Sequence, residues 1–599
     1  MTKIQNPVLP GFNADPSFVR GLDELGNTVY YIANSTFEWF PGVQIHRSYD
    51  LANWELVARP LDSVELLDMK GDPDSGGIWA PDLSYADGLW WLVYTDVKVT
   101  EGTYKDCANY LTTAPSIFGP WSKPIHLTNS GFDASLFHDT DGRKYLVNMY
   151  WDPREFKHPF AGIELTEYSH EQRTLLPKTS RIIHQGTNVK LVEGPHLYKL
   201  NTPKGEFYYL FAAQGGTTYT HQEIVARSKT LDGQFVTQPR SFEGEPFLTA
   251  YQSPFTKLQK TGHGALVEVG GVITNDVTKN QWYFAHLASR PLTNPESSQI
   301  DPRGYCPLGR ETAIEKVEWN KDGWPYIVGG KQGQAEFDAP DLVQPEEIPS
   351  HHQGVRDNYK LPLDFQTLRI PFTDNIGKYQ VAEHVEGKYK NGQSDEWNSF
   401  GQLTLYGHES LSSLFTQAHV ARRWQSLEFT SEVFVNFCPS TYQQNAGLTA
   451  YYNTRHWTFL NITNSGSGLP HNIPDVDYIG AETNKRVLEI VQVDRGVSSH
   501  ILGATGSQVL IPESIEYVGL KLVVSKNKYH YEYTFDSSDS SAIVWHKVGP
   551  EFSTFGLSDD YTLETYGGFF TGAFVGLAAV DGTGQGISAK FERFKYIEK

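Results

Sequence analysis

The chain has 599 residues, which exceeds one ordinary domain and predicts two or three. Aromatic residues make up 13% of the chain and glycine occurs 53 times, which together with short alternating apolar runs favours an all-β protein. The net charge of −20 argues against nucleic acid as a partner, because phosphate binding needs a cationic surface, but it is compatible with neutral sugars.

Three cysteines, Cys107, Cys306 and Cys438, lie far apart and predict neither a metal site nor a disulfide framework. The first seven residues lack the apolar core of a signal peptide. No apolar run is long enough to span a membrane. We therefore expect a cytoplasmic protein that does not bind membranes.

An aromatic strand pattern recurs five times in the first half of the chain, at intervals of about 55 to 75 residues. The copies are Val29-Tyr30-Tyr31-Ile32-Ala33, Trp90-Trp91-Leu92-Val93-Tyr94, Tyr145-Leu146-Val147-Asn148, Phe207-Tyr208-Tyr209-Leu210-Phe211 and Trp282-Tyr283-Phe284-Ala285. Such an interval is the length of a four-stranded unit with its loops. The repeat therefore predicts a five-bladed β-propeller.

A second short segment, with a polar or acidic residue among small residues, precedes each aromatic strand. These segments are Asn13-Ala14-Asp15-Pro16-Ser17, Ala80-Pro81-Asp82-Leu83-Ser84, Phe132-Asp133-Ala134-Ser135-Leu136, Glu193-Gly194-Pro195-His196-Leu197 and Gly262-His263-Gly264-Ala265-Leu266. The first strand of each blade lines the axis of a propeller. We therefore expect Asp15, Asp133 and Glu193, at the same phase of three blades, to converge on one point.

The propeller repeat ends near residue 327, and a polar stretch follows that includes His351 and His352. This stretch, residues 329–359, is typical of a linker or strap. Strand signals resume from about residue 361 in another rhythm and continue for more than 200 residues, which predicts a β-sandwich. The expected domains are a catalytic propeller over residues 1–327 and a linker with a β-sandwich over residues 328–599.

Several of these segments resemble family 43 glycoside hydrolases, particularly the β-xylosidases. The segments that carry the resemblance are residues 6–17, 35–43, 79–82, 193–199, 415–425 and 570–576. Their order and number make the resemblance specific, and it runs nearly end to end. It implies a propeller followed by a C-terminal β-sandwich, an exo-acting, inverting mechanism on xylo-oligosaccharides, no required cofactor, and a homo-oligomer.

The resemblance also assigns the catalytic acids residue by residue. Inverting hydrolysis needs a base that activates water and an acid that protonates the leaving oxygen. Carried over by motif, Asp15 is the general base and Glu193 the general acid. Asp133 is the third acid, which raises the pKa of Glu193 and orients it. Each acid alone has the alternative of a turn or strand-end residue, but their joint occurrence in three blades favours catalysis.

Two further axial residues have open interpretations. Asp82 lies at the same phase in the second blade and is either a fourth axial acid or a structural residue, of which the structural role is favoured. His263 is the counterpart in the fifth blade. In some relatives a histidine here contacts a central cation, often calcium, whereas a hydrogen-bonded core histidine is the more common alternative.

Aromatic platforms bind the apolar face of a sugar ring. The resemblance points to Phe37, Trp79 and Trp151 around the terminal sugar. It also points to Arg290 for sugar hydroxyls or a catalytic carboxylate, and to Phe570 of the sandwich as a wall of the pocket. Packing between blades is the alternative for each aromatic residue.

Three functions remain in competition from sequence. The first is a 1,4-β-xylosidase that releases xylose from non-reducing ends. The second is an α-L-arabinofuranosidase, because the two sugars present similar hydroxyls in space. The third is a non-catalytic carbohydrate-binding propeller, against which the presence of all three acids argues.

Overall fold

The computed structural model describes residues 2–241, 244–293, 303–349, 360–380, 401–465, 485–502, 508–537, 543–563 and 569–599. Strands dominate these residues, so the predicted all-β class is confirmed. The chain divides into two compact units. The first comprises Met1–Pro291, Gln299–Arg303 and Gly309–Asn358, and the second comprises Leu292–Ser298, Gly304–Leu308 and Tyr359–Lys599.

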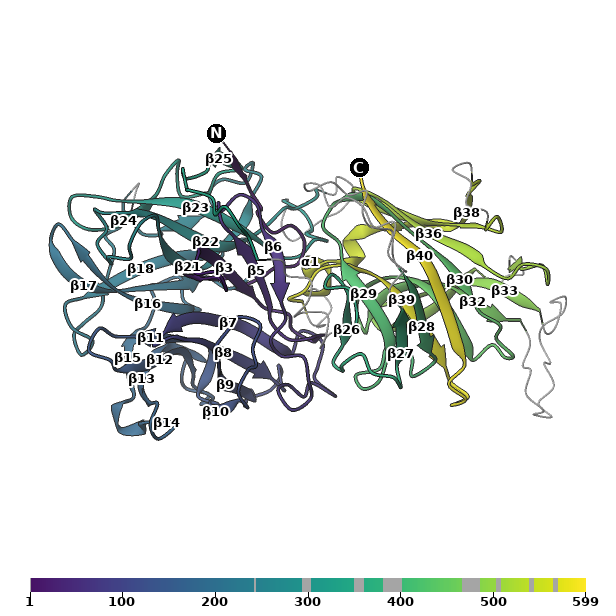
Figure 1. The fold of residues 1–599 in the computed structure, drawn as a ribbon, viewed down its shortest axis with the longest axis horizontal. Helices are drawn as coiled ribbons and strands as arrows, with labels where there is room; N and C mark the ends of the chain where they lie inside the picture. The colour runs from purple at the N-terminus through teal and green to yellow at the C-terminus, as the bar shows by residue number, and fades with distance from the viewer. Residues whose placement is uncertain are drawn as a thin grey trace. The chain divides into compact units, whose positions relative to one another are not determined.

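The first unit is the predicted five-bladed propeller, built from five antiparallel sheets (Figure 1). Blade one contains β2 (Ser17–Leu22), β3 (Thr28–Asn34), β5 (Gln44–Ser48) and β6 (Glu55–Ala58). Blade two contains β7 (Gly77–Ala86), β8 (Leu89–Val97), β9 (Cys107–Ala114) and β10 (Ile125–Thr128). Blade three contains β11 (Gly131–His138), β12 (Lys144–Trp151), β13 (Phe160–Ser169), β14 (Thr174–Leu175) and β15 (Arg181–His184). Blade four contains β16 (Glu193–Thr202), β17 (Gly205–Gln214), β18 (Gln222–Ser228), β19 (Val236–Thr237) and β20 (Leu248–Thr249). Blade five contains β21 (Gln259–Val269), β22 (Gln281–Ser289), β23 (Glu311–Trp319) and β24 (Pro325–Ile327).

The five aromatic runs form the second strand of each blade: β3, β8, β12, β17 and β22. These strands are buried along most of their length, which explains why their sequences are continuous apolar runs rather than alternating ones. Their rings fill the space between neighbouring blades. Trp90 packs edge-on against Tyr31 of the preceding blade at 5.1 Å between ring centroids, and Phe211 stacks on Phe284 of the next blade at 5.6 Å.

The propeller also uses chain beyond the fifth blade. Strand β1 (Lys3–Gln5) pairs with β25 (Glu336–Asp338), and the Asn6 side chain exchanges hydrogen bonds with the backbone of Ile314 in β23. The described part of the predicted linker, up to residue 349, therefore belongs to the first unit. The domain boundary expected after residue 327 stays a prediction.

The second unit is the predicted β-sandwich. One sheet contains β26 (Gln366–Leu368), β29 (Ala418–Arg423), β39 (Phe574–Asp581), β31 (Gln444–Asn453), β32 (His456–Asn464), β33 (Arg486–Asp494), β34 (Val497–Leu502) and β35 (Val509–Leu510). The other contains β27 (Gly377–Gln380), β28 (Gln402–Tyr406), β40 (Ser588–Glu598), β30 (Glu428–Asn436), β36 (Val518–Ser525), β37 (Lys528–Thr534) and β38 (His546–Ser553). Side chains such as Leu448 and Leu520 fill the core between the two sheets.

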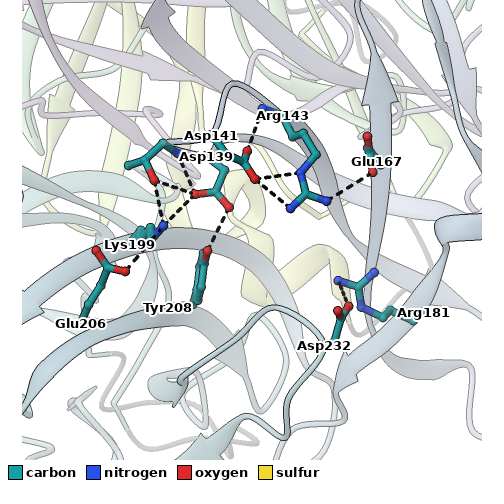
Figure 2. Close-up of polar contacts among 10 residues, drawn as sticks. Asp139, Asp141, Arg143, Glu167, Arg181, Lys199, Glu206, Tyr208 and Asp232 are labelled. Carbon is teal, nitrogen blue, oxygen red and sulfur yellow. Dashed lines mark hydrogen bonds and ion pairs between the residues drawn. The ribbon is translucent and has the colours of Figure 1, made fainter.

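A polar network joins the third and fourth blades (Figure 2). Asp139, in the turn after β11, accepts hydrogen bonds from Lys199 Nζ at 3.3 Å and from the Tyr208 hydroxyl at 3.0 Å. Its side chain is only 2% exposed. Asp141, two residues further on, pairs instead with the exposed Arg143 of its own turn. The buried carboxylate, not the exposed one, therefore connects the two blades.

We expect Asp139→Ala to destabilise the propeller by about 1–3 kcal/mol, because it leaves a half-buried lysine and a tyrosine hydroxyl without their shared acceptor. The urea midpoint of the full chain measures this loss. Asp141→Ala is the matched control, and its exposed pair predicts a change of about 0–1 kcal/mol. Equal midpoints for the two variants would contradict the role of Asp139.

Candidate active site

All five inner strands of the propeller carry the same backbone irregularity at the axis. One residue in or next to each strand has a positive φ: Asp15 (51°), Ala80 (36°), Asp133 (54°), Gly194 (57°) and His263 (49°). The pairing with the second strand shifts at this point in blades two to five. Left-handed backbone is rare for residues with side chains, and bulges of this kind re-aim side chains next to active sites.

The left-handed residue of each segment gives a reference point against which the positions of the acids can be compared. Asp15, Asp133 and His263 are themselves the left-handed residues of their segments, whereas Glu193 precedes the left-handed residue by one position and Asp82 follows it by two. The expectation that all four acids share one phase is therefore wrong for Glu193 and Asp82.

Asp82 consequently belongs to another part of the axis. Its Oδ2 accepts a hydrogen bond from the backbone N–H of Leu136 at 2.8 Å, which ties blade two to blade three. It lines a separate cavity of about 280 Å³ together with His196. This environment agrees with the structural role that the sequence favoured.

Asp15 is almost fully buried and held by three neighbours. Arg310 Nη1 lies 2.8 Å from its Oδ1, His263 Nδ1 lies 3.6 Å from the same oxygen, and the Ser35 hydroxyl donates to its Oδ2 at 2.7 Å. Burial alone raises the pKa of Asp15. The positive charge of Arg310, with help from His263 and Ser35, more than offsets that effect and holds the pKa below its ordinary value.

The pKa values of Glu193 and Asp133 shift upward, opposite to that of Asp15. Burial, followed by the charge of Asp15, raises the pKa of Glu193 to about 8. Burial and the neighbouring Glu193 raise the pKa of Asp133 as well. Glu193 Oε1 is buried and has no hydrogen-bond partner among the described residues. The site therefore sets an ionised carboxylate, Asp15, beside an acid that stays protonated at neutral pH.

Asp133 acts on the backbone that carries Glu193. Its Oδ2 accepts a hydrogen bond from the N–H of Gly194 at 3.1 Å. Gly194 itself packs so tightly that an added Cβ would lie 2.8 Å from the His263 ring, and its φ is positive. The peptide after Glu193 is thus fixed by a hydrogen bond on one side and by a close contact on the other.

The aromatic candidates form a continuous series around the first three blades. Ring centroids are 5.6 Å apart for Phe12 and Phe37, 6.1 Å for Phe37 and Trp79, 5.3 Å for Trp79 and Phe132, and 6.3 Å for Phe132 and Trp151. Three of the five were sequence candidates. Phe12 and Phe132 were missed, although Phe132 directly precedes Asp133 as Trp79 precedes Ala80.

The arginine that pairs with Asp15 is Arg310, which sequence reasoning missed. Arg290, the predicted candidate, forms a two-pronged ion pair with the buried Glu311, at 2.6 and 2.7 Å. Glu311 also accepts from the backbone N–H of Gly11, near the start of the Asp15 segment. Contact of Arg290 with sugar hydroxyls stays a prediction.

Phe570 lies in the second unit, where its ring is 4.4 Å from that of Phe569. Its predicted role as a wall of the sugar pocket stays a prediction.

Within the described ranges, no group of three or more His, Cys, Asp and Glu side chains has the arrangement of a metal site. His263 has Asp15 as its carboxylate neighbour. These two side chains supply fewer ligands than the six to eight oxygens that a calcium ion takes. No helix of the described chain is both long and apolar enough to cross a bilayer.

Comparison with known proteins decides the family. The model for glycosyl hydrolases family 43 matches residues 4–325, and the model for the beta xylosidase C-terminal concanavalin A-like domain matches residues 389–597. The chain belongs to glycosyl hydrolase family 43. It is therefore a glycoside hydrolase, and the predicted family and enzyme class are confirmed.

Several members of this family are similar over their whole length. A protein named beta-xylosidase from Bacillus subtilis (strain 168) is 47% identical over 600 residues, covering 100% of both chains. Xylosidase/arabinosidase 43B from Humicola insolens is 39% identical, covering 100% of this chain and 98% of its own. The crystal structure of xylan beta-1,4-xylosidase from Bacillus halodurans C-125 matches with a TM-score of 0.82 and 41% identity, covering 99% of this chain and 100% of that one.

We expect Arg310→Gln to raise the pKa of Asp15, because it removes the main charge that lowers that pKa. Fewer enzyme molecules then carry an ionised Asp15 at a given acidic pH, so the acid limb of kcat/KM against pH should move to higher pH. Arg290→Gln is the control, since Arg290 pairs with Glu311 rather than with Asp15. An acid limb unchanged in Arg310→Gln would contradict this assignment.

Proposed function

We propose that this glycoside hydrolase is an exo-acting, inverting β-xylosidase that releases xylose from the non-reducing ends of xylo-oligosaccharides. The observation that carries the proposal is the pair of buried carboxyl groups whose pKa values are displaced in opposite directions, Asp15 downward and Glu193 upward. Such a pair provides a base and an acid in one site at the same pH. The names of the Bacillus relatives support xylose as the released sugar.

Asp15 acts as the general base on water. Its Oδ1 is engaged by Arg310 and its Oδ2 by Ser35, which leaves the second lone pair of Oδ2 to accept a proton from a water molecule. The water attacks the anomeric carbon in a single displacement from the face opposite the leaving group, so the configuration at that carbon inverts. Arg310 keeps Asp15 ionised until the water arrives.

Glu193 acts as the general acid on the leaving oxygen. Its raised pKa keeps the proton on the carboxyl group at neutral pH, and its Oε1 makes no hydrogen bond to any described residue. The proton is therefore free to pass to the glycosidic oxygen as the bond breaks. Asp133 is a positioning residue in this scheme, because it holds the Gly194 N–H rather than the reacting atoms.

The aromatic series provides the sugar platform. We assign Phe37, Trp79 and Trp151 to the walls around the terminal sugar, and add Phe132 between the two tryptophans. Their edges and faces suit the apolar face of a pyranose ring. The homo-oligomeric state, the cytoplasmic location and the calcium near His263 stay predictions.

We expect Glu193→Gln to lower kcat for xylobiose by about 10²–10⁴-fold, because glutamine cannot donate the proton that a sugar leaving group needs. A dinitrophenyl β-xyloside, whose leaving group departs as a stable anion, should lose far less. Asp82→Asn is the matched control, a buried axial acid outside this site, and both rates should stay close to wild type. Equal losses on the two substrates would contradict the role of Glu193 as the acid.

The second candidate activity is that of an α-L-arabinofuranosidase, favoured by the name of the Humicola relative. We expect kcat/KM for nitrophenyl β-D-xyloside to exceed that for nitrophenyl α-L-arabinofuranoside at least about tenfold, since the five-membered ring and exocyclic CH2OH group of the arabinofuranoside differ in shape from the six-membered ring of the xyloside. Steady-state kinetics with both substrates on one enzyme preparation measure the ratio. A preference for the arabinoside would reverse the proposal.

A further inference from the structure

The sandwich contains a pocket of its own, with a volume of about 390 Å³. It is lined by the first residues of β32, the last residues of β33, Tyr529 of β37, and the segment that contains η3 (Thr554–Leu557) and α1 (Asp559–Leu563). Strands β32 and β33 are neighbours in one sheet, whereas β37 belongs to the other (Figure 1). Its volume lies in the range of small-molecule sites, about 300–1,000 Å³.

Aromatic rings form much of the wall. Trp457 comes from β32 and Tyr561 from α1, while Tyr305 and Phe555 pack together with ring centroids 4.9 Å apart. Every lining residue belongs to the second unit. The pocket therefore shares no residue with the carboxylate site of the propeller. Rings with both an apolar face and a polar edge suit a ligand of the same mixed character.

The charged groups of the pocket neutralise one another. The Tyr561 hydroxyl donates to both oxygens of Asp494, at 3.1 and 3.0 Å, and accepts a hydrogen bond from Arg495 Nε at 3.1 Å. The guanidinium of Arg495 also lies 4.8 Å from the centre of the Tyr561 ring. The negative Asp494 and the positive Arg495 thus both hydrogen-bond to the Tyr561 hydroxyl. The pocket has no excess charge from this pair, which favours a neutral ligand over an anion or a cation.

Gln492 of β33 contributes an amide group to the pocket. It lies opposite Thr458 in the pairing of β33 with β32, and its side chain is half-buried. The Thr458 hydroxyl is occupied by the hydroxyls of Tyr529 and Tyr531, at 3.0 and 2.9 Å. The amide of Gln492 makes no hydrogen bond within the described part of the chain. An amide offers two donors and an acceptor, the set that a sugar hydroxyl can satisfy.

We propose that this pocket is a second, non-catalytic binding site for neutral carbohydrate, which takes one or two pyranose units of an oligosaccharide. Trp457 and Tyr561 supply the stacking surfaces, and Gln492, Asp494 and Arg495 supply the hydrogen bonds. The site depends on residues of the sandwich alone and not on hydrolysis by the propeller. It gives the second unit a binding function of its own.

The test is calorimetric titration of the full-length chain carrying Glu193→Gln, which prevents hydrolysis during the measurement, with xylobiose and with cellobiose as probes. We expect two binding sites for at least one of the two probes. Adding Gln492→Ala should weaken one site at least about tenfold and leave the other unchanged, because the hydrogen bonds of one amide are lost. Tyr561→Phe keeps the ring but removes the hydroxyl that joins Asp494 to Arg495, and should weaken the same site.

Ser498→Ala is the matched control, an exposed residue of β34 in the same sheet that does not line the pocket. It should leave both sites unchanged. A single site for both probes, or a second site that neither Gln492→Ala nor Tyr561→Phe weakens, would overturn the proposal. In an otherwise wild-type chain, Gln492→Ala should hydrolyse nitrophenyl β-xyloside at the normal rate, so failure of the proposed hydrolysis and failure of the second site give separate results.

Discussion

The proposed catalytic arrangement depends on a backbone constraint that recurs in or next to all five inner strands, a left-handed residue in each axial segment. In a regular strand, neighbouring side chains point to opposite sides of the sheet. A bulge breaks that alternation and allows an acid at or beside it to point along the axis. Asp15 and Asp133 have the left-handed φ themselves. Next to Glu193 the left-handed residue is Gly194, where any side chain would clash with the His263 ring. The bulge therefore determines which acids meet.

Once these acids meet, burial makes their charges interact strongly. Water is largely excluded from all three carboxyl groups, so each charge is costly unless a partner compensates it. Arg310 lies 2.8 Å from Asp15, and its charge is the main influence that lowers the pKa of this carboxyl group. The ionised Asp15 then disfavours a second negative charge on Glu193, which keeps its proton. The direct salt bridge to Arg310 thus separates the lowered pKa of Asp15 from the raised pKa of Glu193, as the proposed base and acid require.

The two units use aromatic residues in different ways. In the propeller, most rings fill the space between blades, and a series of five beside the acids is the sugar platform that we propose. In the sandwich, the core between the sheets is mainly aliphatic, while Trp457 and Tyr561 lie around a pocket with paired charges. The same residue type therefore serves packing in one place and offers a binding surface in another, according to the polar groups beside it.

The sequence by itself determined the class, the number of blades and the sandwich, and it indicated the three acids of the proposed site. These features are local: the aromatic runs repeat at a regular interval, and each acid lies in a short segment within the residues that the family model matches. Only the tertiary structure decided that Arg310, 295 residues from Asp15, is its charge partner, and that Arg290 pairs with Glu311. It also decided the one-residue offset of Glu193 and the leading part of burial and Asp15 in its raised pKa. Ion pairs, bulges and burial depend on residues brought together from distant parts of the chain, and they leave no periodic pattern in the sequence.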